Sequence, residues 1–150
     1  MNYVNTVTGP VAASELGRTL MHEHFLFGFC GFQGDATLGG FKEEEYARDC
    51  LKAVDDARAY GINTIVDATT NECGRNVRFL KKISDMTGMN IICSTGYYFQ
   101  AESAYAYWNF RRGFANIEEE IYEMMVTELT KGIEGTDVKG RRHQTGQQLQ

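Results

Sequence analysis

The sequence contains no excess of basic residues. Lys and Arg number 15 against 20 Asp and Glu, so the formal net charge is −5, and the acidic residues are scattered along all 150 positions. A surface that binds nucleic acid needs a basic patch, and this charge balance argues against one. The apolar runs are also far too short to cross a bilayer. We therefore expect neither nucleic acid nor a membrane among the partners.

Three local patterns are missing as well. The N-terminal stretch "MNYVNTVTGP" lacks the basic and apolar regions of a signal peptide. The dispersed cysteines form no C-x-x-C pair, so a structural zinc site is not expected. No G-x-G-x-x-G follows a predicted strand, which argues against a dinucleotide site. Dispersed cysteines without a secretion signal are typical of reduced, core-filling thiols and predict a cytoplasmic protein; they are Cys30, Cys50, Cys73 and Cys93.

The segments that are present alternate between strand and helix patterns. A chain of 150 residues suits a single domain with a real core. Strands rich in β-branched residues, placed between amphipathic helices, indicate a parallel sheet and hence an α/β fold. The predicted order is a hairpin over 3–17 turning at Gly9 and Pro10, a strand over 18–27, a helix over 43–61, a strand over 62–70, a helix over 74–88, a strand over 89–99, a polar and aromatic loop to 115, and a helix that Asn116 caps.

The first of these longer strands carries a pair of histidines in "TLMHEHFLF". Residues i and i+2 of a strand point to the same face, so His22 and His24 are close enough to bind one metal ion. Imidazole suits zinc, cobalt, nickel or iron, but two ligands are too few for a tight site. Two polar residues satisfied by their neighbours would fit the same pattern. The position before a glycine-rich loop, at a strand's C-terminal end, favours the metal site.

Polar residues also end the other two predicted strands. Asp67 could orient a metal-bound histidine, although capping the following loop is the commoner role of such an aspartate. Tyr97 or Tyr98 must face inward, where its hydroxyl could bond a reacting oxygen, or the ring could simply pack at the rim. Both strand ends are therefore candidates for the same site.

Two further candidates lie outside the strands. Arg75 could bind an anion, although a solvated arginine or one at a helix start is commoner. Trp108, with Tyr105 and Tyr107, could form an apolar wall for a substrate, or it could pack in the core or an interface. The sequence leaves these alternatives open.

Four motifs together resemble the phosphotriesterase family of the amidohydrolase superfamily: "TLMHEH", "TIVDATT", "GRNV" and "STGYY", in order between about residues 3 and 139. The resemblance implies a (β/α)₈ TIM barrel with two divalent metals, usually zinc. It implies hydrolysis of small-molecule phosphotriesters, lactones or carboxylic esters by a metal-bridged hydroxide. His22 and His24 would bind the more buried metal, and Tyr98 would be the aromatic residue beside the hydroxide, as in the lactonase-like branch. Members of this family are often homodimers.

The same resemblance exposes what the chain lacks. The family also uses a carboxylated lysine from strand four, histidines from strands five and six, and an aspartate from strand eight. Since such a barrel needs roughly 250 residues, this chain corresponds to an N-terminal hairpin and about three βα units of an incomplete barrel. We therefore expect a hydrolase by descent that is inactive as this chain. The alternative is a non-catalytic truncated paralogue that binds a partner through its open sheet edge.

The last segment departs from the family pattern. Residues 1–139 form the barrel portion, whereas 140–150, "GRRHQTGQQLQ", predict neither helix nor strand and are expected to be disordered. The family pattern after "DVK" would be Ala-Gly-Val-Ile-Lys. Codons chosen for residues 140–148 give Ala-Gly-Val-Ile-Lys-Leu-Ala-Asn once the first base is dropped. In that frame His143 can become only isoleucine or threonine, and Gln144 only lysine or arginine. We prefer a one-base frameshift to a genuine alternative C-terminus.

The nucleotide sequence from codon 140 onward tests this hypothesis. A frameshift requires that dropping one base restores the family pattern and opens a downstream frame with two more histidines and an aspartate. Codons that cannot produce that second frame would end the hypothesis.

Overall fold

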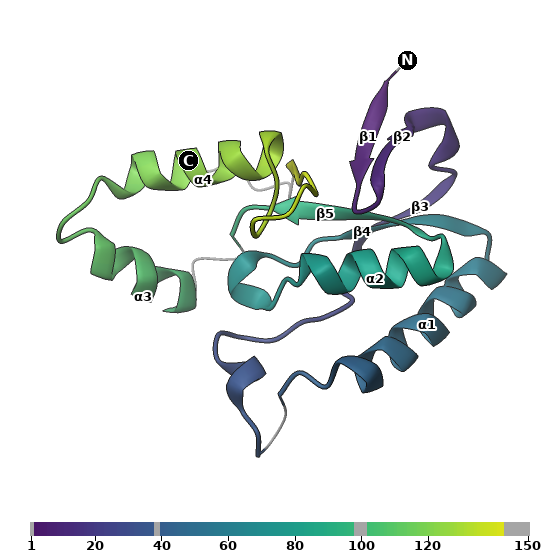
Figure 1. The fold of residues 1–150 in the computed structure, drawn as a ribbon, viewed down its shortest axis with the longest axis horizontal. Helices are drawn as coiled ribbons and strands as arrows, with labels where there is room; N and C mark the ends of the chain where they lie inside the picture. Colours follow the sequence, from purple (N-terminus) through teal and green to yellow (C-terminus); the bar gives the residue numbers. More distant parts are fainter. Residues whose placement is uncertain (1, 38–39, 98–101, 143–150) are drawn as a thin grey trace.

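The computed structural model describes residues 2–37, 40–97 and 102–142 (Figure 1). Within them a four-stranded sheet has the order β3-β4-β5-β6, and every neighbouring pair runs parallel. A separate antiparallel hairpin joins β1 to β2. The α/β fold with a parallel sheet is therefore confirmed. The strands are β1 (Tyr3–Thr6), β2 (Gly9–Ala12), β3 (Arg18–Glu23), β4 (Ile62–Asp67), β5 (Asn90–Thr95) and β6 (Arg141–Arg142).

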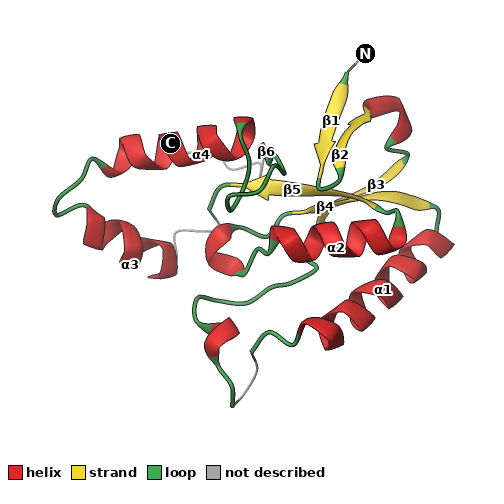
Figure 2. Ribbon diagram, in the orientation of Figure 1, coloured by secondary structure: helices red, strands yellow, loops and turns green. Residues whose placement is uncertain are grey.

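Two pairs of helices accompany the sheet (Figure 2). Helices α1 and α2 pack against each other and against β4 and β5, whereas α3 and α4 form a helical hairpin that extends away from the sheet. No helix in the described part of the chain is long and apolar enough to span a bilayer. The helices are α1 (Glu43–Ala59), α2 (Val77–Thr87), α3 (Glu102–Arg111) and α4 (Ile117–Thr130), with short 3-10 helices at Ala13–Glu15, Phe32–Gly34 and Asn71–Cys73.

The main core lies between the sheet and helices α1 and α2. Ile65 and Ile91 are partners in the register of β4 and β5, and both are buried in this core. Val54 of α1 and Ile83 of α2 are completely buried in the same cluster. Each such side chain contributes roughly 1.5–3 kcal/mol to folding. The predicted helical stripes therefore face the strands as the sequence pattern requires.

Local signals set the bounds of the predicted helices. The Asn76 side chain accepts a hydrogen bond from the Phe79 amide at 3.0 Å, which caps α2. Gly88 follows α2 in the left-handed region with φ 69°. The predicted cap of α4 is confirmed, because Asn116 accepts from the Glu119 amide.

The described strands do not close into a barrel. β3 pairs with β4 and β6 pairs with β5, so these two strands stand at opposite ends of the sheet. This open parallel sheet agrees with the expected N-terminal hairpin followed by βα units.

The hairpin turns two residues earlier than predicted. Val7 and Thr8 form the turn, and Gly9 and Pro10 already belong to β2. The Thr6 hydroxyl donates to the Gly9 carbonyl oxygen at 2.7 Å and closes the turn. Gly9 has φ 124°, which a residue with a side chain rarely adopts.

The predicted loop before Asn116 contains a helix, α3, so that prediction is wrong. Its aromatic residues do not form one apolar stripe, and the periodic pattern is therefore weak. The helix is instead fixed by contacts with its neighbour. The Arg111 guanidinium makes two hydrogen bonds to the Glu120 carboxylate of α4, one of them 2.6 Å long, and lies between the rings of Tyr107 and Phe114.

The prediction of no strand beyond residue 139 is wrong for two residues. Arg141 and Arg142 form β6 and pair in parallel with Ser94 and Thr95 of β5. Sheet pairing uses backbone groups, which a side-chain pattern does not reveal. Residues 143–150 lie outside the described residues, and the expected disorder there stays a prediction.

A buried ion cluster joins the loop before α2 to α4. The Arg75 side chain is 1% exposed and donates to both Glu128 carboxylate oxygens, at 2.5 and 3.0 Å. It also donates to Glu134 at 3.2 Å and to the Ser94 carbonyl oxygen at 3.1 Å. Burial lowers the pKa of Arg75, but Glu128 and Glu134 outweigh that effect and raise it overall. Arg75 is thus neither an anion site nor a solvated residue.

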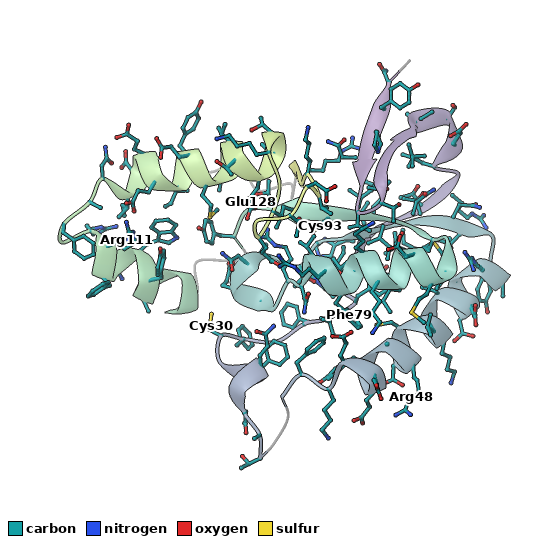
Figure 3. All side chains as sticks on the ribbon, in the orientation of Figure 1. Cys30, Arg48, Phe79, Cys93, Arg111 and Glu128 are labelled. Atoms are coloured by element: carbon teal, nitrogen blue, oxygen red, sulfur yellow. The ribbon has the colours of Figure 1, made fainter. Side chains whose placement is uncertain are left out.

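Two further features complete this cluster. Glu128 lies on the side of α4 that faces β5 (Figure 3), and it also accepts a hydrogen bond from the Thr95 hydroxyl. The turn that returns the chain from α4 to Glu134 depends on Gly132, where an added Cβ would collide with the Thr136 carbonyl oxygen. The cluster therefore closes around the C-terminal end of β5.

Arg75→Met should destabilise the chain strongly. The substitution leaves Glu128 buried without a counter-charge, and breaking a buried pair in this way costs about 3–5 kcal/mol. Urea denaturation measures the loss in the free energy of unfolding. Arg48→Met, at an exposed position of α1 away from the cluster, is the matched control and should change stability by about 0.5 kcal/mol or less. Equal losses in the two variants would contradict the structural role of Arg75.

Candidate metal centre

The histidine pair lies at the C-terminal end of β3. His22 is in the strand and His24 is one residue beyond it. Their ring centroids are 5.2 Å apart with an interplanar angle of 77°, and both side chains are exposed. The two imidazoles therefore lie close enough to reach one ion, as the strand spacing predicts.

Asp67 connects the end of β4 to the segment after β3. Its carboxylate is 1% exposed and accepts from the Phe25 amide at 2.9 Å and from the Thr69 amide at 2.8 Å. Burial raises the pKa of Asp67, while the hydrogen bonds and the nearby His24 work against that rise. The loop-capping role that the sequence left open is thus visible, and its bonds reach across to the other loop. The orientation of a metal-bound histidine by Asp67 stays a prediction.

Thr69 is a site residue that sequence reasoning missed. Its hydroxyl lies 2.9 Å from Nδ1 of His24 and donates to the Leu26 carbonyl oxygen at 3.0 Å. In "TIVDATT" this threonine looks like one more β-branched strand residue. Its position two residues after the predicted buried strand could have identified it as a site residue, because the C-terminal ends of parallel strands gather at one edge of the sheet.

The aromatic candidates lie in different places. The Tyr97 hydroxyl donates to Sδ of Met124 at 3.0 Å, and its ring contacts Trp108 with centroids 6.0 Å apart. Trp108 also contacts Tyr107. Both Tyr97 and Trp108 therefore pack within the α3–α4 hairpin region, which favours the packing interpretation. Tyr98 lies outside the described residues, as does the side chain of Tyr105.

The cysteines do not join the histidines. In the described residues no group of three or more His, Cys, Asp and Glu side chains could hold a metal ion. Cys50, Cys73 and Cys93 are buried free thiols, and Cys30 is exposed. Burial, with Asp49 and Asp67, raises the pKa of Cys50 to about 11. The core-filling role is confirmed for the three buried thiols.

The chain has parallel βα units and an H-x-H pair at the carboxyl end of β3, the first strand of the parallel sheet. This arrangement is that of an α/β-barrel protein, in which polar side chains gather at the C-terminal ends of the strands. A model of the Phosphotriesterase family matches residues 2–141. The chain belongs to this family.

Individual relatives agree with this assignment. A Phosphotriesterase-related protein of Nematostella vectensis is 36% identical over 163 residues, which cover 89% of this chain and 45% of the relative. An Aryldialkylphosphatase of Saccharolobus solfataricus is 30% identical, with 84% of this chain and 38% of the relative covered. An organophosphorus hydrolase structure from Deinococcus radiodurans superposes with a TM-score of 0.86 at 48% identity, and covers 92% of this chain and 41% of that one. The chain thus spans less than half the length of these relatives, and it corresponds to the N-terminal part of their barrel.

Asp67→Ala should destabilise the site end of the sheet. The change leaves the Phe25 and Thr69 amides without their acceptor, and each such loss costs about 1–3 kcal/mol when the donor is buried. Asp67→Asn keeps one acceptor oxygen and should lose less. Denaturation of these variants beside Asp56→Ala, an exposed control in α1, measures the difference. Similar stability of Asp67→Ala and Asp56→Ala would show that the carboxylate does not cap the loops.

Proposed function

We propose that this chain supplies part of the metal centre of a hydrolase that acts on phosphotriesters, lactones or carboxylic esters. The observation that carries the proposal is the His22–His24 pair on one face at the C-terminal end of β3. Family membership supports it, since relatives include an Aryldialkylphosphatase and an organophosphorus hydrolase. Another similar structure is that of a mutant of a phosphotriesterase-like lactonase from Deinococcus radiodurans.

The donor set fits zinc as part of a larger set of ligands. His22 and His24 would hold the ion through imidazole nitrogens, which zinc accepts readily. A zinc ion held there would supply an activated water and a positive charge that polarises the oxygen of the substrate. The residues of this chain hold the histidines in place: β3 sets their shared face, and Asp67 ties the following backbone to β4 through the Phe25 amide.

The hydrolytic chemistry of the family needs more metal ligands than the two histidines of this chain. Two imidazoles give weak metal affinity, because three or four ligands are usual. We therefore infer that the 150-residue chain is inactive alone. The small-molecule substrate and the homodimer belong to the complete barrel in this proposal.

The alternative of a non-catalytic partner-binding protein rests on the open sheet. β3 and β6 each have a neighbour on only one side among the described strands. A closed barrel would pair both edges with its own later strands, so open edges also agree with the hydrolase proposal. The His22–His24 pair favours the hydrolase.

A chimera tests the proposal. Residues 2–139 replace the matching segment of the Deinococcus radiodurans organophosphorus hydrolase, so that the remaining barrel supplies the other ligands. We expect zinc-dependent hydrolysis of a lactone or phosphotriester, and its loss in the His22→Ala and His24→Ala chimeras. Arg48→Ala, exposed on α1, is the control and should keep the activity. A folded chimera that is equally active without either histidine would overturn the metal assignment.

The chain alone provides the complementary measurement. The purified 150 residues, given zinc, should show no hydrolysis of the same substrates. Zinc-dependent turnover that disappears in His22→Ala would overturn the inference that this chain is inactive.

A further inference from the structure

The Thr69 side chain is placed between the two loops that meet at the histidine pair. Thr69 is 1% exposed and lies just after β4, whereas His24 and Leu26 follow β3. Its hydroxyl reaches Nδ1 of His24 at 2.9 Å and the Leu26 carbonyl oxygen at 3.0 Å. A single buried oxygen therefore contacts both a ring nitrogen and a backbone acceptor.

The number of protons decides the direction of these two hydrogen bonds. A threonine hydroxyl has one proton to donate and lone pairs that accept. The Thr69 hydroxyl donates its proton to the Leu26 carbonyl oxygen, which can only accept, and the Asp67 carboxylate, which also bonds the Thr69 side chain, is a second acceptor for that proton. The hydroxyl oxygen then accepts from Nδ1–H of His24. This arrangement leaves Nε2 of neutral His24 unprotonated, with a lone pair available to a metal.

Neighbouring contacts keep the arrangement rigid. The Thr69 amide donates to Asp67, whose other oxygen accepts from the Phe25 amide next to His24. The Phe27 ring contacts the His24 ring edge-on with centroids 5.1 Å apart. Turning the ring to exchange its nitrogens would break the Thr69 bond and disturb this packing.

We propose that Thr69 is a positioning residue that holds His24 in the Nδ1–H tautomer and so presents Nε2 to the metal. The inference rests on the proposed metal function of His24, which it deepens. Ligating histidines commonly donate the second ring N–H to a protein group, and loss of that partner typically weakens metal binding by about 10- to 100-fold. Here the partner is a hydroxyl from the neighbouring strand end.

Nitrogen NMR of the ¹⁵N-labelled 150-residue chain tests the tautomer without metal. In mildly alkaline buffer, where imidazoles are neutral, long-range ¹H–¹⁵N spectra distinguish the protonated ring nitrogen from the bare one. We expect the His24 proton on Nδ1 in the parent and in Thr69→Ser, which retains the hydroxyl. Thr69→Val should lose this preference. Thr70→Val, which removes the hydroxyl of the adjacent buried residue, is the control and should match the parent.

Two NMR results would overturn the proposal. One is a parent chain whose His24 is protonated on Nε2, and the other is a folded Thr69→Val chain that keeps the Nδ1–H form.

Zinc titration of the same samples adds a second readout. Affinity should fall about 10- to 100-fold in Thr69→Val and return in Thr69→Ser. Equal affinity in parent and Thr69→Val would also overturn it. No zinc response in a parent that shows the Nδ1–H tautomer would still support the positioning of His24, because two imidazoles alone bind zinc weakly. The zinc titration is then repeated with the chimera, where loss of zinc-dependent activity on His24→Ala tests the proposed function separately.

Discussion

The Arg75 ion cluster joins parts of the chain that are far apart in sequence. One guanidinium bonds Glu128 at the end of α4, Glu134 in the following turn and the Ser94 carbonyl oxygen in β5. It ties α4 and the turn that leads to β6 to the sheet, alongside Ile133 of that turn, which is buried in the core. Because a buried charge is costly when unpaired, the three segments must be in place together for the cluster to form.

A second set of bonds performs a similar task at the histidine pair, with neutral groups and one carboxylate. Asp67 and Thr69, at the end of β4, hold the backbone of residues 25 and 26 and the ring of His24. The exposed His24 is thus supported by a buried partner from the end of the neighbouring strand. The histidine rings are therefore open to solvent, while the groups that hold the His24 ring and its backbone, Thr69 and Asp67, are buried.

The sequence predicted well where structure follows local pattern. Helices α1 and α2, strands β4 and β5 and the Asn116 cap all follow from periodicity and capping residues. The H-x-H spacing placed both imidazoles together because strand alternation is strict. Arg75, Thr69 and α3 were misjudged or missed for a common reason. Their roles depend on partners more than 40 residues away or on a neighbouring helix, and no spacing rule encodes those contacts.

The short strand β6 pairs with the edge of β5 without a strand-like side-chain pattern of its own. Its pairs are formed by main-chain amides and carbonyls, so two arginines can occupy the positions beside Ser94 and Thr95. The space beside the preceding residue is tighter: a Cβ on Gly140 would approach Ile133 at 3.0 Å and Thr95 at 3.2 Å, so these neighbours would have to shift slightly to admit it. Space is therefore limited at residue 140, whereas the pairing of residues 141 and 142 depends on backbone groups. A template of this kind can extend a barrel, but it offers little protection against an incorrect extension.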